Sequence, residues 1–178
     1  MTVTIIDVAA ALWFIFPAYC ANAAPVIFGG GQAMDFGKIF FDGKSLLGSH
    51  KTFRGFLAGL IIGTLVGLLQ TLLFKQFFFQ YGAQFRYTVY LGFMLSLGAL
   101  TGDLIESFIK RRLNRSPGKS LPIADQIDFI LGAFLFSLPV TPPSLLAAAI
   151  ILSITIPIHL ITNLAAALLK MKNKRKNI

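Results

Sequence analysis

The chain has 178 residues, of which 56% are hydrophobic and 13% are charged, and its mean hydropathy is +0.75. Soluble domains carry about 25% charged residues, so this composition excludes an ordinary water-soluble fold and indicates a membrane protein. The net charge of +9 would suit a nucleic-acid-binding protein. However, lysine and arginine fall almost wholly in the gaps between apolar runs, as membrane topology requires, so we expect no nucleic-acid partner. A single cysteine, Cys20, excludes a disulfide framework and a cysteine-based metal site.

Five apolar runs follow one another along the chain, and crossing a bilayer takes about 20 residues. They cover residues 5–24, 56–74, 87–109, 122–138 and 145–169. Pro17 interrupts the first run, and Pro157 predicts a kink in the last. The sequence therefore predicts an all-α fold, a single polytopic membrane domain over residues 1–178. Its polar parts are the loops 25–55 and 110–121 and the basic tail 170–178.

The distribution of basic residues predicts the orientation. Lysine and arginine concentrate in the two long loops and in the tail, whereas the other two connections hold only Lys75 and Arg86. Five spans place the three basic segments on one side, which the positive-inside rule makes cytoplasmic. Four or six spans would divide these segments between the two sides. We therefore expect a multi-pass protein of the cell membrane, with its N-terminus outside and its C-terminus in the cytoplasm.

The second run carries glycine at every fourth residue, at Gly55, Gly59, Gly63 and Gly67. Small residues at this spacing let two helix backbones approach closely in lipid. We assign these glycines a packing role and no chemistry. Their face would also suit pairing with a second copy of the chain, so a homodimer is one option.

Acidic residues inside a membrane segment are costly and mark function by default. Asp103, Glu106, Ser107 and Lys110 share one face of the third helix because they follow helical spacing. Asp125 and Asp128 begin the fourth run, so two neighbouring helices would bring three aspartates together at the cytoplasmic mouth. The alternative is that these acids pair with nearby cations or cap helix starts. For the whole set we favour a site for Mg²⁺, which prefers hard oxygen ligands and is completed by substrate phosphates.

Two basic, glycine-bearing loops lie beside these acids in the sequence, over residues 42–55 and 110–120. Glycine frees backbone amides to face phosphate oxygens, and lysine or arginine neutralises them. We favour phosphate binding for Lys51, Arg54, Lys110 and Lys119. Both loops contain Gly-Lys-Ser, but neither has the spacing of a Walker A loop or follows a strand, so we reject a P-loop.

These residues also carry a family resemblance. The stretch from Gly102-Asp103 through Glu106-Ser107 and Lys110-Arg111 to Asp125-Gln126-Ile127-Asp128 resembles the signature of the CDP-diglyceride synthases. Ser120 and Gln126 replace the aspartate and arginine of that signature, and its Gly-His-Gly-Gly stretch is missing. The chain is in these respects similar to the archaeal branch of the family, the CDP-archaeol synthases. Its short length and the segments Asn22-Ala23-Ala24-Pro25 and His50–Gly55 also resemble that branch.

The resemblance implies a CTP-dependent cytidylyltransferase, a nucleotidyltransferase of membrane phospholipid biosynthesis. It would convert an isoprenoid diether lipid phosphate, 2,3-di-O-geranylgeranylglyceryl phosphate, into its CDP-lipid and release pyrophosphate. Asp103, Asp125 and Asp128 would hold one or two Mg²⁺ and, with Lys110, form the catalytic set. The residues expected to bind substrate or nucleotide are Asn22, Asp42, Lys44, Lys51, Thr52, Arg54, Glu106, Ser107, Arg111 and Lys119. Cytosine recognition is left open between Asn22 and the loop 42–55.

Two rival functions remain at the level of sequence. A CTP-dependent kinase of a membrane alcohol would share the membrane, CTP and Mg²⁺ but would transfer the γ-phosphate. A small anion transporter would place its site near the midplane of the bilayer, usually within inverted repeats. The polar cluster at one end and the absence of a detectable repeat argue against transport.

Overall fold

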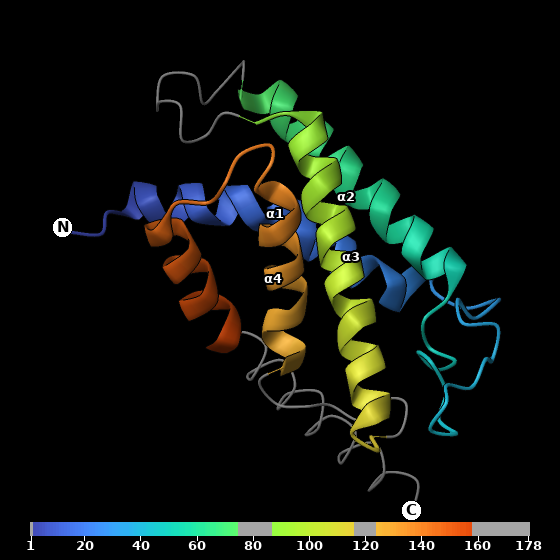
Figure 1. The fold of residues 1–178 in the computed structure, drawn as a ribbon. Coiled ribbons are helices and arrows are strands. Elements are labelled where there is room, and N and C mark those ends of the chain that lie inside the picture. Colours follow the sequence, from blue (N-terminus) through green and yellow to red (C-terminus); the bar gives the residue numbers. More distant parts are fainter. Residues whose placement is uncertain (1, 75–86, 116–123, 158–178) are drawn as a thin grey trace, which may run out of the picture.

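The computed structural model describes residues 2–74, 87–115 and 124–157. Four helices are labelled in Figure 1: α1 (Ile5–Phe28), α2 (Phe53–Leu73), α3 (Val89–Arg112) and α4 (Ala124–Ser137). A fifth, unlabelled helix spans Leu145–Pro157. Within these ranges the only β-structure is two isolated bridges in the loop between α1 and α2, which confirms the all-α prediction. Three of the helices, α1, α2 and α3, are long and apolar enough to cross a membrane.

The helix boundaries differ from the predicted spans because polar caps, rather than hydropathy, determine where the helices begin. Thr4, Thr52 and Thr88 are the N-caps of α1, α2 and α3, and each side chain accepts a hydrogen bond from a backbone N–H of the first turn. Thus α2 begins at Phe53 rather than at residue 56. The kink predicted at Pro157, the rest of the last span and the basic tail lie outside the described residues.

Helices α3 and α4 run antiparallel and side by side, while α1 crosses the bundle at a wide angle (Figure 1). Glycines make the contact between α3 and α4: a Cβ added at Gly132 would lie 3.0 Å from the Cα of Gly102. The two backbones therefore meet directly, as small residues allow in membrane proteins. This close approach brings the acidic turn after Gly102 next to the first turns of α4.

The glycine face of α2 packs inside the molecule. Gly55, Gly59, Gly63 and Gly67 are all buried, and a Cβ at Gly67 would lie 2.7 Å from the Cα of Gly92 in α3. The packing role predicted for these glycines agrees with these contacts. Because α1 and α3 already cover this face, it offers no surface for the homodimer that its spacing suggested.

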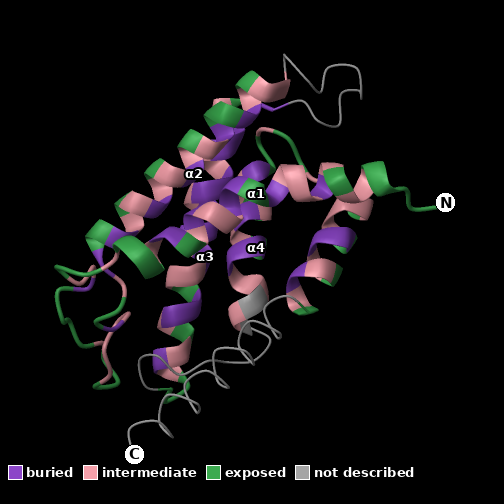
Figure 2. Cartoon of the chain, turned by 180° about the vertical axis from the view of Figure 1, so that it is seen from behind, coloured by how far each residue is buried: buried purple, intermediate pink, exposed green. Residues whose placement is uncertain are grey.

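The opposite face of α2 is apolar and exposed, and its exposed large apolar side chains are Phe53, Leu57, Ile61, Leu65, Leu68, Leu69 and Leu72. The buried colour concentrates where α1, α3 and α4 meet (Figure 2). There the core combines Ile15 of α1, Leu95 of α3 and Phe129 of α4 with Ile151 of the fifth helix, each 0% exposed. The outward stripe of α2 is what a lipid-facing surface requires.

Candidate active site

A polar cavity of about 550 Å³ opens where the end of α1, the α1–α2 loop, α3 and α4 converge. Asp103 and Lys110 of α3 and Asp125 and Asp128 of α4 line it. Asn22 enters from α1, and residues 49–52 enter from the loop. Close packing of α3 on α4 thus brings the three predicted aspartates to one cavity, together with the predicted Asn22, Lys51, Thr52 and Lys110.

Two lysines are held among the acids by short ion pairs. The Lys51 ammonium donates to both carboxylate oxygens of Asp103, at 2.6 and 2.7 Å. The Lys110 ammonium lies 2.6 Å from Glu106 and 2.8 Å from Asp125, and its side chain is 12% exposed. With Asp128, four carboxylates therefore face two ammonium groups in the part of the chain that the structure describes. Concentrated negative charge in a half-buried place is costly unless a cation balances it.

Three of these carboxylates are arranged to share a cation. One oxygen from each of Asp103, Glu106 and Asp128 lies within 4.8 Å of the others, and Oδ1 of Asp128 is buried without a hydrogen-bond partner among the described residues. The predicted ligand trio contained Asp125 in place of Glu106. Both Glu106 and Asp125 pair with Lys110, and the carboxylate oxygens that converge are those of Asp103, Glu106 and Asp128. Hard carboxylate oxygens in this number fit Mg²⁺.

A second, largely apolar groove of about 370 Å³ is lined by residues of α3 and α4. Its apolar lining is Ile105, Ile109, Ile127, Leu131 and Leu135. Glu106 and Asp128 also line it, and Asp128 lines the polar cavity as well. Asp128 therefore borders both the polar cavity and the apolar groove.

The loop between α1 and α2 is folded around one buried carboxylate, that of Asp35, which is 6% exposed. It accepts backbone hydrogen bonds from Gly37, Leu47 and Gly48, at 2.8 to 2.9 Å. Burial alone would raise the pKa of Asp35, but these hydrogen bonds stabilise the ionised form more strongly and hold its pKa below the usual range. Asp35 thereby fixes the segment that leads into Lys51. Sequence reasoning missed it, since a lone loop aspartate carries no pattern.

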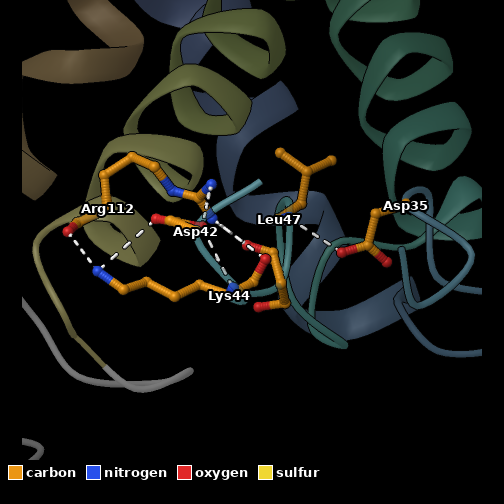
Figure 3. Close-up of polar contacts among 6 residues, drawn as sticks. Asp35, Asp42, Lys44, Leu47 and Arg112 are labelled. Atoms are coloured by element: carbon orange, nitrogen blue, oxygen red, sulfur yellow. Dashed lines mark hydrogen bonds and ion pairs between the residues drawn. The ribbon is translucent and has the colours of Figure 1, made fainter. Parts of the chain in front are cut away.

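A second contact ties the same loop to the end of α3 (Figure 3). The guanidinium of Arg112 lies 3.0 Å from Asp42, donates to the carbonyl of Ser45 at 2.6 Å, and packs on the rings of Phe40 and Phe108. Lys44 donates to the carbonyl of Arg112 at 3.0 Å. Asp42 and Lys44, predicted to bind nucleotide, thus form a clamp between loop and helix and do not line the polar cavity.

Of the remaining predicted site residues, those that the structure describes do not line the polar cavity. Arg54 is exposed, donates to the carbonyl of Phe28, and does not line the cavity. Ser107 and Arg111 are buried on α3, 5% and 6% exposed, and Lys119 lies outside the described residues. His50, to which the sequence assigned no role, does line the cavity; its position directly before Lys51 was the available signal.

Comparisons with known proteins agree on one family. The chain matches the family of CarS-like CDP-archaeol synthases over residues 3–175. The chain belongs to the CDP-archaeol synthase family. It is 45% identical to the CDP-archaeol synthase of Methanocaldococcus jannaschii, covering 92% of this chain and 94% of that one. It is 43% identical to the CDP-archaeol synthase of Pyrococcus furiosus, covering 92% and 95%.

A solved structure described as an intramembrane enzyme for archaeal membrane lipid biosynthesis matches with a TM-score of 0.75 at 34% identity, covering 86% of this chain and 92% of that chain. The sequence-based assignment to the CDP-archaeol synthases is thereby confirmed. A multi-pass membrane protein of helical fold is confirmed with it.

Proposed function

We propose that this member of the CDP-archaeol synthase family transfers the cytidylyl group of CTP to an archaeal diether lipid phosphate at the carboxylate cluster of α3 and α4. The product is a CDP-lipid, and pyrophosphate leaves. One observation carries the assignment of the site: Asp128 lines both a polar cavity and an apolar groove. A reaction that joins a nucleotide to a lipid phosphate needs such a boundary between a water-filled and a lipid-filled space.

The polar cavity is the proposed CTP site. Its volume of about 550 Å³ falls within the range of about 300 to 1,000 Å³ that is usual for small-molecule sites. Lys51 and Lys110 supply positive charge for the phosphates, and Asp103, Glu106 and Asp125 hold the two ammonium groups in position. The amide of Asn22, which lines the same cavity, can both donate and accept hydrogen bonds and is the candidate reader of cytosine.

The apolar groove is the proposed site for the isoprenoid tails. Branched aliphatic side chains from both helices line it, together with Glu106 and Asp128. A lipid whose tails occupied this groove would therefore present its phosphate to the carboxylate cluster. The negative charge there would repel the phosphate unless a cation intervened, which again supports a divalent metal.

We propose Asp103, Glu106 and Asp128 as the residues that hold Mg²⁺. Their convergent oxygens fit such an ion, as does the buried Oδ1 of Asp128, which has no hydrogen-bond partner among the residues that the structure describes. When bound, the ion would neutralise phosphate charge and favour displacement at phosphorus. The chain itself positions the reactants: a lipid phosphate oxygen forms a bond to the α-phosphorus of CTP while the bond to the departing pyrophosphate breaks. Lys51 and Lys110 offset the charge of the phosphates, and such a transfer is largely positioning and electrostatics.

The membrane orientation is part of the proposal. The whole chain forms one membrane domain with its N-terminus outside, which puts the polar cavity on the cytoplasmic side, where CTP is available. The basic residues of the two long loops support this orientation. A cysteine introduced at Val3 in a Cys20→Ala background should react with an impermeant maleimide on intact cells. Protection of that cysteine until the cells are opened would reverse the orientation.

The decisive experiment is an incubation of purified protein with labelled CTP, Mg²⁺ and a diether glycerol phosphate. Diacyl phosphatidic acid and a dolichol serve as alternative acceptors. A cytidine-labelled lipid that disappears with EDTA and in Asp128→Asn supports the proposal. Asp7→Asn is the matched control, because Asp7 caps the first turn of α1 and does not line the polar cavity. Formation of a plain lipid phosphate without cytidine would instead indicate a kinase.

A further inference from the structure

The loop between α1 and α2 presents three apolar side chains to its outside, which we call the apolar loop edge: Phe36, Ile39 and Phe41. They are 63%, 68% and 98% exposed. Exposed aromatic residues grouped in this way mark an interaction site rather than ordinary surface. The neighbouring Phe40 packs onto Phe108 and Arg112. The ring of Phe41 lies 4.8 Å from that of Phe40, and Phe41 remains exposed.

Phe36 occupies a backbone position that disfavours it. Phe36 and Gly37 both have positive φ, 52° and 74°, and the N–H of Lys38 donates to the carbonyl of Asp35 at 2.8 Å. This is the pattern of a type I′ turn, in which glycine, asparagine or aspartate is the usual first central residue. A bulky residue at positive φ is strained. Phe36 is nevertheless 63% exposed, so this strained position keeps an aromatic side chain at the surface of the loop.

The apolar loop edge continues the exposed apolar face of α2. The ring of Phe36 contacts that of Phe53, with centroids 5.3 Å apart, and Phe53 is the first residue of α2 and begins its outward stripe. The loop lies at the end of the bundle where α2 begins and α3 ends (Figure 1). A surface in contact with acyl chains along α2 therefore passes without a break into the apolar loop edge.

Charge and residue type identify the partner. Lys38, in the middle of the apolar loop edge, and Arg54, in the first turn of α2, are both exposed. Aromatic rings flanked by basic side chains are typical of the interface between bilayer and water, and basic residues near that surface are attracted to anionic headgroups. We propose that the apolar loop edge inserts into the headgroup region of the bilayer and holds the loop that carries Lys51 against the membrane surface.

Tryptophan fluorescence tests this directly, because the chain has one tryptophan, Trp13. In a Trp13→Phe background, Phe41→Trp places an indole on the apolar loop edge. Arg115→Trp is the matched control, since Arg115 is exposed beyond the last turn of α3. Both variants are reconstituted into vesicles of phosphatidylglycerol brominated near the top of its acyl chains. Phe41 is exposed, so its substitution leaves the fold intact.

We expect the brominated lipid to quench the indole at position 41 at least about two-fold more strongly than that at position 115, with acrylamide showing the reverse order. Replacing phosphatidylglycerol by phosphatidylcholine should weaken the lipid quenching at position 41. Equal acrylamide quenching at both positions, with no effect of brominated lipid, would overturn the proposal. Shielding at position 41 that appears only at high protein density, without lipid quenching, would overturn it in favour of a contact between two copies of the chain.

Discussion

Replacing Asp128 with asparagine should stabilise the metal-free protein and at the same time abolish turnover. The substitution keeps the shape of the side chain and removes one of four negative charges that, among the described residues, face the ammonium groups of Lys51 and Lys110. In the absence of metal, the carboxylate of Asp128 is mainly repelled by its neighbours. With metal and substrate bound, the same carboxylate supplies a ligand that an amide replaces poorly. Stability and activity should therefore change in opposite directions.

The structure sets the size of the effect. Two unit charges separated by 4.8 Å, the limiting distance within the carboxylate trio, repel by about 3.5 kcal/mol at an effective dielectric constant of about 20. Attraction to Lys51 and Lys110 offsets part of this repulsion. We expect a net gain of about 1 to 2 kcal/mol in the free energy of unfolding. For a chain of this length, that corresponds to a rise of about 2 to 8 °C in Tm.

The single cysteine provides the assay. Cys20 lies in α1 and is partly buried, so its reaction with a thiol-reactive fluorophore follows thermal unfolding in detergent. Wild type, Asp128→Asn and Asp7→Asn are each heated in EDTA and in Mg²⁺. Wild type should gain Tm on addition of Mg²⁺, and Asp128→Asn should gain little. Turnover of Asp128→Asn should fall by at least about 100-fold.

Two results would refute the reasoning. If Asp128→Asn lowered Tm in EDTA and kept the Mg²⁺-dependent gain, neither the excess negative charge nor the ligand assignment would hold. If it retained wild-type turnover across Mg²⁺ concentrations, the metal site would lie elsewhere. The control Asp7→Asn should lose a little stability through its weakened helix cap and keep both the Mg²⁺ effect and turnover.

Three further predictions follow from the packing and from the loop. Gly67→Ala should lower the free energy of unfolding by about 1 to 3 kcal/mol, because the new Cβ meets the backbone of α3; the lipid-facing Leu65→Ala, measured alongside by the same cysteine assay, should not. Arg112→Lys should free the loop from α3, because lysine lacks the guanidinium group that binds Asp42 and the Ser45 carbonyl. Faster tryptic cleavage after Lys38 would report this release, whereas an unchanged cleavage rate would disprove the clamp. The ionised Asp35 should stabilise the loop at pH values above the ordinary aspartate pKa, and this contribution should be lost as the pH falls through the lower pKa of the folded state. The difference in Tm between wild type and Asp35→Asn should therefore shrink at acid pH. A difference that grew at acid pH would contradict this prediction.

Much of the site could be predicted from local spacing. Asp103, Glu106 and Lys110 share a helix face whatever the rest of the chain does, because helical periodicity decides it. The prediction that Asp125 and Asp128 join them required only that consecutive antiparallel helices pack together, and all three aspartates do line one cavity. Which carboxylates pair with lysine and which converge on one point was not predictable, because Glu106 and Asp125 both lie within reach of Lys110.

The loop between α1 and α2 was the least predictable part. Its basic residues look equivalent in sequence, yet Lys51 reaches Asp103, Lys44 reaches the end of α3, and Arg54 turns back to α1. Such directions depend on contacts between segments far apart in the chain, and no helical period constrains them. Asp35, around which the loop folds, was missed for the same reason.

The sequence by itself determined the membrane class, the helical fold and the family, because hydropathy, helical period and motif spacing are properties of the chain as written. Only the tertiary structure decided that glycines in α3 and α4 bring the acids together, that α1 and α3 cover the glycine face of α2, and that Asp42 and Lys44 form a clamp rather than lining the polar cavity. The physical reason is the range of the interactions involved. Transfer to lipid acts on each segment separately, whereas backbone contact, ion pairing and cavity shape exist only between segments once they are packed.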